Sequence, residues 1–373
     1  MNKILIVSTV SRQFYLFEQS NIEVLQSLGF EIHAAANFND ENERLDTLDL
    51  IRHHFDIQRS PFSLNNIKAY KQLKKIMKSE NFDAVHCHSP MGGALARLAA
   101  KSAGITPVIY TAHGFHFYNG AHLINWLLYY PVERFLSRCT DVLITINKED
   151  YARAQRFKAK KAIYVPGIGV DTKKFSEINM NRNKKRKELC LSKDTIAILS
   201  VGEMIKRKNH ETALRALAKL ETQNYMYLIC GKGDLENYLK DLSISLGIKD
   251  KVKFLGYRND IPEICIASDM FLFPSYQEGL PVSMMEAMAA GLPIVCSLIR
   301  GNTDLIDDGK GGYLIDPDDI DGFAKKVEKL INNSELLKTM GKRNADEVEK
   351  FDKTKVKSEM KKLYNKAIRN INM

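Results

Sequence analysis

Two glutamates eight residues apart are the residues best suited to chemistry: Glu278 and Glu286, in the stretch EGLPVSMMEAMAAGLP. Glu286 stands among methionines and alanines, where a carboxylate is seldom buried unless it is paired or binds a ligand. Glu278 precedes a predicted helix N-terminus, where unpaired backbone N–H groups attract anions. The N–H groups that could hold a phosphate there are those of Gly279, Leu280, Val282 and Ser283. The pattern favours a site for a nucleoside diphosphate, although Glu286 could instead cap a backbone or pair with a lysine.

Two predicted elements position these carboxylates. The apolar run at 270–275 is typical of a buried strand. Pro281 suits the first position of a helix, and Gly291 followed by Pro293 is typical of a helix end. A buried helix is therefore predicted from about Pro281 to Ala290, with Glu278 on the loop before it and Glu286 in its middle.

Short apolar runs alternate with helical stretches along the chain, which predicts parallel sheets with helices on both faces. Six predicted strands lie in each half, so we expect an α/β protein of two similar, Rossmann-like, doubly wound domains. In the first half the predicted strands are 4–9, 31–36, 84–88, 107–113, 141–147 and 162–167. In the second half they are 197–202, 227–231, 252–256, 270–275, 293–297 and 312–316.

The length of 373 residues also indicates two domains. Their boundary is predicted near Pro166–Asn183, which is rich in Gly, Lys and Asn. The predicted divisions are a first domain, 1–168, a second domain, 169–353, and a C-terminal helix, 354–373, that packs back on the first domain. Such sheets bind ligands at the carboxyl ends of their strands, so functional groups are expected on loops that face a cleft between the domains.

Basic residues directly follow the first strand of the second half, at the start of a helix: Lys206, Arg207 and Lys208. Cations at a helix N-terminus fit a diphosphate, although the segment could equally be a solvated basic turn. Arg258 follows the strand at 252–256, and its guanidinium plane could stack on a base.

One histidine of the first half also stands where a ligand is expected. His113 ends its predicted strand and is followed by a glycine, which lets a backbone or ligand approach closely. A structural role for this histidine remains open at this point. The position at a strand's carboxyl end is the reason to count it as a candidate.

Patterns for metals and dinucleotides are weak. His86 and His88 would share one face of a strand, but no further ligand set follows from the sequence, so no metal site is predicted. The DPD at Asp316–Asp318 reads as a helix cap. The GKGDLE at Gly231–Glu236 lacks the full dinucleotide fingerprint.

Composition indicates an ordinary soluble globular protein that stays in the cytoplasm. Hydrophobic residues make up 45% and charged residues 27%, and no apolar run is long enough to span a bilayer. The N-terminus lacks the pattern of a signal peptide, and the six cysteines are scattered without paired spacing.

The net charge of +10 is concentrated between Arg153 and Lys187, where twelve basic residues face two acidic ones. Such a strip favours an anionic partner, namely a diphosphate or lipid head groups, or else it is a solvated linker. Nucleic acid is not expected, because no DNA- or RNA-binding motif is present.

A membrane-facing surface is a further expectation. The stretch at 124–135 is apolar and contains Trp126, Tyr129 and Tyr130, which are typical of a membrane interface or of a core helix. Lysines crowd another predicted helix: Lys68, Lys71, Lys74, Lys75 and Lys78. We therefore expect reversible attachment to an anionic membrane surface, on the inner face of the cell membrane.

Taken together, these motifs resemble a known family. The Glu-x₇-Glu of Glu278 and Glu286 resembles the donor motif of retaining glycosyltransferases of family 4, which have the GT-B fold. VGEMIKRKNH, starting at Val201, resembles the phosphate loop of that family. HSPMGGALARLAAKSAG followed by VIYTAHGFHFYNG resembles bacterial exopolysaccharide and capsule assembly enzymes.

The resemblance implies roles for the candidate residues. Glu286 would bind the ribose hydroxyls, Glu278 the donor sugar, and Lys208 the diphosphate. His113 would contact the donor sugar and its leaving-group region. Glu203 departs from the family, which often has Arg there, so either Lys206 or Arg207 substitutes for that Arg or the phosphate is held more weakly.

The implied activity is hexosyl or N-acetylhexosaminyl transfer from a UDP-sugar, with retention of configuration and without a metal or other cofactor. The implied acceptor is a polyprenyl-diphosphate-linked saccharide in surface glycan biosynthesis. Two alternatives from other classes remain: a sugar-nucleotide epimerase of the same fold, and a non-catalytic sugar-nucleotide-binding scaffold of a glycan assembly complex.

Overall fold

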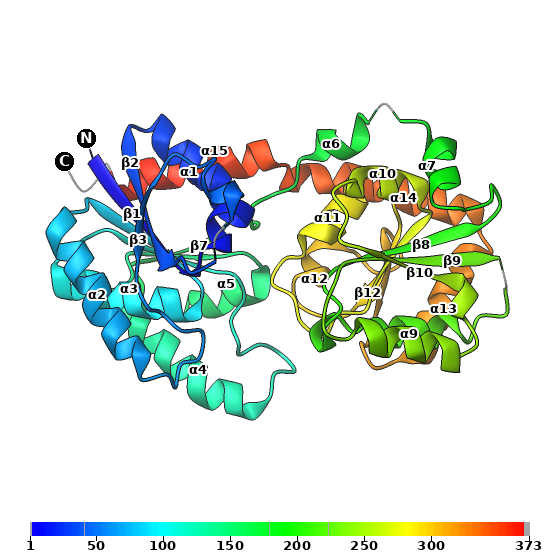
Figure 1. Ribbon diagram of the computed structural model, residues 1–373, viewed down its shortest axis with the longest axis horizontal. Helices are drawn as coiled ribbons and strands as arrows, with labels where there is room; N and C mark the ends of the chain where they lie inside the picture. The colour runs from blue at the N-terminus through cyan, green and yellow to red at the C-terminus, as the bar shows by residue number, and fades with distance from the viewer. Residues whose placement is uncertain (1, 41, 179, 223, 369–373) are drawn as a thin grey trace. The chain divides into compact units, whose positions relative to one another are not determined.

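The structure is a computed structural model that describes residues 2–40, 42–178, 180–222 and 224–368 (Figure 1). Its internal contacts divide the chain into two compact units. The N-terminal unit contains the first 168 residues together with the chain after Lys353, and the C-terminal unit is Gly169–Lys353. Each unit is built around its own parallel sheet, so each is described by itself.

The N-terminal unit has a sheet of seven strands among the described residues, in the order β3-β2-β1-β4-β5-β6-β7. Every pair is parallel. The strands are β1 (Asn2–Val10), β2 (Phe30–Asn37), β3 (Ile51–His54), β4 (Ala84–His88), β5 (Val108–Ala112), β6 (Val142–Thr145) and β7 (Lys161–Tyr164). The chain direction across the sheet reverses between β1 and β4, and a ligand site is expected at the carboxyl ends beside such a switch.

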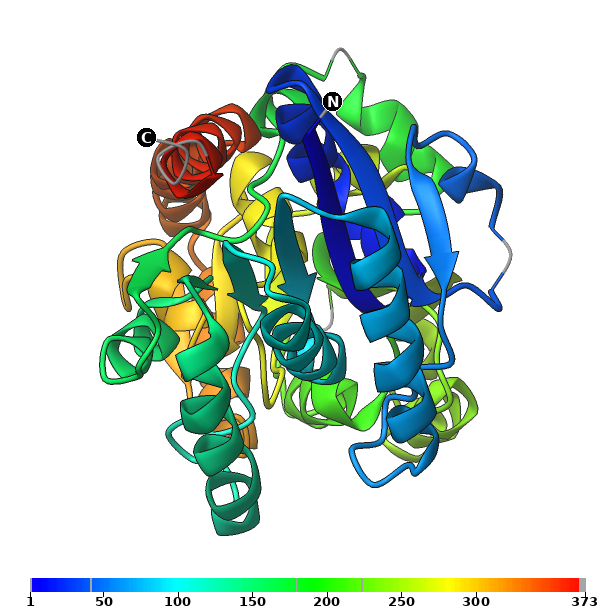
Figure 2. The same cartoon turned by 90° about the vertical axis from the view of Figure 1, so that its left-hand side faces the viewer.

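Helices cover both faces of this sheet (Figure 2). They are α1 (Gln19–Ser27), α2 (Asn65–Glu80), α3 (Pro90–Ala103), α4 (Leu123–Leu136), α5 (Lys148–Ala154) and α15 (Lys353–Ile368). One core lies under α2 and α3 and includes Leu73, Met77 and Ala96. The core of the opposite face lies under α1 and α15, where Met360 and Tyr364 are buried. The C-terminal helix therefore completes the core of the N-terminal unit.

The C-terminal unit has a parallel sheet of six strands among the described residues, in the order β10-β9-β8-β11-β12-β13. The strands are β8 (Ile196–Val201), β9 (Tyr225–Cys230), β10 (Val252–Gly256), β11 (Met270–Phe273), β12 (Ile294–Ser297) and β13 (Gly312–Ile315). The chain reverses across the sheet between β8 and β11. Figure 1 shows α9 and α13 on one face of this sheet and α10 and α11 on the other.

The helices of the C-terminal unit are α6 (Thr172–Ser176), α7 (Arg182–Glu188), α8 (His210–Leu217), α9 (Glu236–Ser245), α10 (Ile261–Ala267), α11 (Val282–Ala289), α12 (Asn302–Leu305), α13 (Ile320–Ile331) and α14 (Ser334–Val348). One hydrophobic core of this unit lies under α8, α9 and α13 and includes Leu214, Leu239 and Phe323.

The prediction of two parallel α/β sheets is confirmed, but the prediction of six strands in the first half is wrong. The structure adds β3 at the sheet edge, where the sequence reads Ile-Arg-His-His. Three of these four residues are exposed, so the strand lacks the apolar run that marked the others. Among the described residues, no helix combines the length and the apolar character that crossing a bilayer requires.

Candidate active site

Two loops of the C-terminal unit meet at its topological switch. They follow β8 and β11, which are hydrogen-bonded neighbours and parallel, so both loops leave the same edge of the sheet. The N–H of Tyr276 donates to the carbonyl of Arg207 over 2.9 Å. The side-chain amide of Asn209 donates to the carbonyl of Pro274, also over 2.9 Å. These bonds fix the basic loop after β8 against the glutamate loop after β11.

Glu278 lies where the two loops meet and is 8% exposed. Its Oε1 accepts hydrogen bonds from Nζ of Lys208 at 2.8 Å and from the guanidinium of Arg207 at 3.0 Å. Lys208 can lie there because Gly202 has no side chain: a Cβ on Gly202 would stand 3.3 Å from the Lys208 chain. Two cations on one carboxylate leave an excess of positive charge, which suits an anionic ligand.

A third loop, which follows β12, contacts the backbone of the Glu278 loop. Arg300, which follows β12, is buried and donates from Nε to the backbone carbonyl of Glu278 over 3.1 Å. Gly301 has a φ of +80°, and a Cβ there would stand 2.4 Å from the carbonyl oxygen of Gly279. The sequence analysis missed this pair. An Arg-Gly in the loop after a predicted strand was the available signal, since loops at carboxyl ends of strands build such sites.

Helix α11 begins directly after this loop. The helix runs from Val282 to Ala289, so Pro281 is its N-cap rather than its first residue, and each end lies one residue inside the predicted bounds. The backbone N–H groups of Val282 and Ser283 lie in its first turn and have no partner within the helix. This N-terminus therefore lies at the same carboxyl edge as Glu278 and Lys208.

Glu286 occupies the middle of α11, next to buried Met285 and Ala287. Burial raises the pKa of Glu286 to about 7, and the charge of Lys174 on α6 acts in the opposite direction. Within the described part of the chain, no hydrogen bond or ion pair to its carboxylate is observed. A half-buried carboxylate without a protein partner is costly, so its presence favours a ligand-binding role over a structural one.

Arg258, which was predicted to stack on a base, is instead bound by carboxylates of the protein. Its guanidinium binds Asp260 through two contacts, at 2.5 and 2.7 Å, and Glu188 at 3.3 Å. Lys185 joins the same carboxylates and is buried. The structure therefore engages Arg258 in an ion-pair cluster that joins α7 to the loop before α10.

His113 directly follows β5 in the N-terminal unit, as predicted. Its Nε2 lies 3.1 Å from Nδ1 of His88 and 3.3 Å from the side-chain nitrogen of Gln13. Burial lowers the pKa of His113 to about 4, so the ring is neutral at pH 7.

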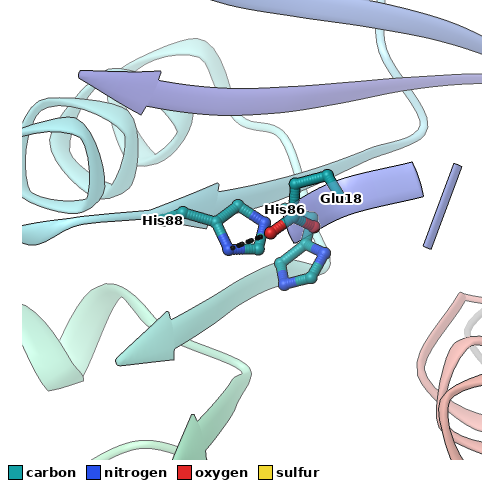
Figure 3. Close-up of side chains that lie close together, drawn as sticks. All are labelled: Glu18, His86 and His88. Atoms are coloured by element: carbon teal, nitrogen blue, oxygen red, sulfur yellow. Dashed lines mark ion pairs between the residues drawn. The ribbon is translucent and has the colours of Figure 1, made fainter. Parts of the chain in front are cut away.

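A buried cluster of Glu18, His86 and His88 adjoins His113 through His88. Figure 3 shows the three side chains of this cluster. The sequence analysis placed the two histidines on one face of a strand, and their rings are 4.2 Å apart. It missed Glu18, which ends the π-helical turn Phe14–Glu18 and lies 3.2 Å from Nδ1 of His88. A π-helical turn carries no sequence signal of the kind used here. Burial raises the pKa of Glu18 to about 7 and lowers that of His86 to about 3.

The cluster has the residue types of a metal site, but protein groups already occupy its ligand atoms. Both ring nitrogens of His86 are bonded, Nε2 to Thr111 and Nδ1 to Tyr364, each at 2.8 Å. The two oxygens of Glu18 accept from amide groups of Gln13 and Asn21. An ion would have to displace several of these bonds, so this arrangement favours a hydrogen-bonded network.

Three cations of the basic strip predicted between Arg153 and Lys187 are engaged within the C-terminal unit. Arg182 and Arg186 pair with Asp269, and Lys185 pairs with Asp260. These residues stabilise the C-terminal unit internally. Counting charges along the sequence could not reveal this, because the acidic partners lie about 80 residues further on.

Comparisons with known proteins assign the family. Residues 3–147 match the family model described as "Glycosyl transferase 4-like", and residues 181–347 match "Glycosyl transferases group 1". The chain belongs to this family of glycosyltransferases, and its enzyme class is that of the glycosyl-transferring enzymes, EC 2.4.

Among its relatives is a Bacillus subtilis (strain 168) protein named as a glycosyltransferase, EpsD. It is 35% identical over 97% of this chain and 96% of its own length. An Escherichia coli relative is 33% identical over 75% of this chain and 74% of its own. It is named UDP-Gal:alpha-D-GlcNAc-diphosphoundecaprenol alpha-1,3-galactosyltransferase.

Solved structures show the same fold. HepE of Anabaena, in complex with UDP and glucose, superposes with a TM-score of 0.80 at 18% identity, over 98% of this chain and all of that one. WaaG, a glycosyltransferase involved in lipopolysaccharide biosynthesis, superposes with a TM-score of 0.73 at 16% identity, over 97% and 99%. The predicted GT-B fold and the resemblance to family 4 are thereby confirmed.

Proposed function

We propose that this glycosyltransferase moves a sugar from a UDP-sugar to a polyprenyl-diphosphate-linked saccharide, with retention of configuration. The reaction would belong to surface glycan biosynthesis and would take place at the cytoplasmic leaflet of the cell membrane. The observation that carries the donor half is the placement of Glu278, Lys208 and Arg207 beside the N-terminus of α11.

The donor site follows from charge and hydrogen-bonding capacity. The diphosphate would bind Lys208 and Arg207 and the free N–H groups of Val282 and Ser283. The unpartnered carboxylate of Glu286 would accept from the ribose hydroxyls. Glu278 would accept from hydroxyls of the donor sugar. The crystallised relative HepE holds UDP and glucose, which supports a nucleotide of this kind.

The acceptor half is supported by relatives. The Escherichia coli relative is named for a diphosphoundecaprenol-linked GlcNAc acceptor. A Campylobacter jejuni relative, 24% identical over 98% of this chain, is named for a diphospho-undecaprenol-linked N,N'-diacetylbacillosamine. We extend the class of acceptor, a saccharide on a polyprenyl diphosphate, to this chain.

The proposed chemistry is a front-face displacement. The acceptor hydroxyl attacks the anomeric carbon on the side of the leaving diphosphate, the bond from that carbon to the phosphate oxygen breaks, and the proton passes to that oxygen. The departing UDP gains negative charge. Lys208 and the N-terminus of α11 would stabilise this charge without a divalent metal, by preorganised electrostatics. His113 would contact the donor sugar at the reacting region.

The central test is UDP release and product formation with a panel of UDP-sugars and diphosphoundecaprenol-linked saccharides. Lys208→Met should lower turnover by about 100- to 1000-fold. The matched control Lys249→Met removes an exposed cation of the same unit, at the amino end of β10 and so away from this edge, and should change turnover less than about threefold. UDP release without transfer to a lipid-linked saccharide would contradict the proposal that the acceptor is such a saccharide. UDP-sugar turnover without any acceptor would favour the epimerase alternative.

Metal independence has its own test. Turnover with the best donor should be unchanged after treatment with a chelator. Loss of activity that manganese or magnesium restores would contradict the metal-free proposal and would direct attention to Asp316 and Asp318 or to the Glu18 cluster.

Attachment to an anionic membrane is supported by the outer face of α4. Leu123 is 80% and Leu127 is 72% exposed, and Ile124, Val132 and Phe135 are exposed beside them. The aromatic residues that suggested an interface lie on the inner face instead, because Trp126, Tyr129 and Tyr130 pack against the core. An apolar row of this kind is unusual on a helix that faces water. Exposed Lys71, Lys75 and Lys78 on α2 supply positive charge on the same unit.

Co-sedimentation with liposomes tests this attachment. Binding should need anionic lipid, weaken as salt rises, and fall strongly in a Leu123→Asp, Leu127→Asp variant. Ile244→Asp, on α9 of the C-terminal unit, is a control because Ile244 is also exposed. If the parent protein remains in the supernatant with anionic vesicles at low salt, the membrane proposal is wrong.

A further inference from the structure

A network of polar side chains connects the interior of the N-terminal unit to His113. Its members are Gln13, Glu18 and His88. The side-chain nitrogen of Gln13 lies 2.9 Å from Oε1 of Glu18 and 3.3 Å from Nε2 of His113. Nδ1 of His88 lies 3.2 Å from the same Oε1 of Glu18 and 3.1 Å from the same Nε2 of His113. Figure 3 shows Glu18 and His88 directed toward each other.

The donors and acceptors in this network can be assigned from chemistry alone. At pH 7.5, above the pKa of about 7 that burial gives Glu18, its carboxylate is mostly ionised and only accepts hydrogen bonds, so it orients the amide of Gln13 with the NH₂ group toward Glu18. That NH₂ group faces Nε2 of His113, which must therefore be an acceptor without a hydrogen. Nδ1 of His88 faces two acceptors, so it carries the ring hydrogen of His88. Since His113 is neutral, its one ring hydrogen is then on Nδ1.

The two remaining ring nitrogens, Nε2 of His88 and Nδ1 of His113, agree with this assignment of hydrogens. Nε2 of His88 is fully buried and has no hydrogen-bond partner, as expected of a bare nitrogen whose ring hydrogen is on the other side. In the described residues no partner is seen for Nδ1 of His113, and it is not among the fully buried atoms that lack one. Nδ1 of His113 is therefore open to a ligand. A buried unpaired nitrogen costs stability, so its retention favours a functional reason.

Glu18 and His88 cannot themselves touch a sugar. Glu18 is 1% and His88 0% exposed. The cavity that they line together with His113 has a volume of about 20 Å³, which is room for one water molecule. Their influence on the reaction must therefore pass through His113.

We propose that Gln13, Glu18 and His88 are positioning residues that hold His113 as the Nδ1–H tautomer, so that it presents an N–H donor to the donor sugar or to the departing diphosphate. This inference rests on the proposed role of His113 in transfer. It assigns a function to the His-Cys-His segment of β4 that the activity itself does not explain. The donor would be neutral, so it would bind an oxygen atom without trapping the released diphosphate by charge.

The direct test is the tautomer of His113, read from the ¹⁵N chemical shifts of histidine-labelled protein, with His113→Asn to assign the signals. The parent should show Nδ1–H at pH 7.5. His88→Phe keeps the ring volume but removes the donor, and a shift of His113 toward Nε2–H is expected. His88→Asn is the matched control, because its amide nitrogen can replace Nδ1 as donor, and it should keep the parent tautomer.

Kinetic measurements distinguish a role of His88 in positioning His113 from a general loss of protein stability. His88→Phe should lower kcat about 10- to 100-fold, the value of one hydrogen bond to a charged group, with KM for the donor within about threefold. His88→Asn should stay within about threefold of the parent in both. His33→Asn, at an equally buried histidine of β2, should leave kcat unchanged. If His88→Phe does not fold, Gln13→Met provides the same test from the other side.

The inference is overturned if His113 of the parent carries its hydrogen on Nε2, or if folded His88→Phe keeps both the Nδ1–H tautomer and the parent kcat. The proposed role of His113 fails separately. In that case His113→Ala retains turnover within a few-fold, whatever tautomer the spectra show.

Discussion

Replacing Glu286 by Gln should make the protein more stable and at the same time weaken its binding of UDP. The carboxylate is half-buried on α11, and no partner for it is seen among the described residues. A glutamine keeps the shape of the side chain and removes the charge. The two effects have opposite signs, which a purely structural glutamate would not produce.

The magnitude follows from the pKa of Glu286, which burial raises from 4.5 to about 7. Between these values the folded chain holds a proton that the unfolded chain has lost. The unfolding free energy is therefore not reduced by Glu286 below pH 4.5, and it falls as the pH rises to about 7. Each pKa unit corresponds to about 1.4 kcal/mol, so the charged form costs roughly 3 kcal/mol above pH 7. Glu286→Gln should recover much of this at pH 8 and almost none at pH 4.5.

The loss of affinity comes from the ribose contact. A hydrogen bond to a charged group contributes about 1.5–3 kcal/mol, so the dissociation constant for UDP should rise about 10- to 150-fold. Titration calorimetry measures this. Denaturant unfolding should be followed by circular dichroism, because the single tryptophan, Trp126, reports only on the N-terminal unit.

Glu18→Gln is the matched control, since burial raises the pKa of Glu18 to a similar value in the other unit. It should alter stability with pH and leave UDP affinity unchanged. The reasoning is refuted if Glu286→Gln lowers stability at pH 8, or if the folded variant binds UDP as tightly as the parent.

Further predictions concern single contacts. UDP affinity of the parent should fall as the pH drops below about 7, where Glu286 takes up a proton, and Glu286→Gln should be insensitive in this range by calorimetry. Arg258→Met should change UDP affinity less than about threefold, because its guanidinium is engaged by protein carboxylates and the pair is partly exposed; a larger loss would place Arg258 at the nucleotide. Gly301→Ala should weaken UDP binding, because the new Cβ would displace the loop of Glu278; unchanged calorimetry would show that the loop adapts. Tyr364→Phe should cost about 1–3 kcal/mol of unfolding free energy, since it leaves Nδ1 of His86 without its donor; unchanged denaturation would contradict this.

The parts of the fold and site that the sequence could predict are those with a local signal. Twelve strands carry a short stretch that is mostly apolar, whereas β3 at the sheet edge is mostly exposed and was missed. Glu278 and Lys208 were predicted as site residues because each lies between a predicted strand and the start of a predicted helix. They bind each other although 70 residues separate them in the sequence. The roles of Arg300, Glu18 and Gln13 depend on contacts between loops distant in sequence. No single-sequence pattern encodes such contacts, and the same reason explains why the ion pair of Arg186 with Asp269 was not foreseen.

The return of α15 to the N-terminal unit has a consequence for how the protein is made. Val356, Met360, Leu363 and Tyr364 fill one core of a unit whose other residues leave the ribosome first. At about 5–20 residues per second, the ribosome needs roughly 10–40 s to synthesise the rest of the chain after residue 168. During this interval one face of the first sheet lacks its cover, while the C-terminal unit already has every residue that it needs before α15 emerges. Co-translational folding should therefore finish at the N-terminal unit, and a stop codon a few residues before Val356 should release a chain whose later half is folded and whose earlier half is recognised by chaperones.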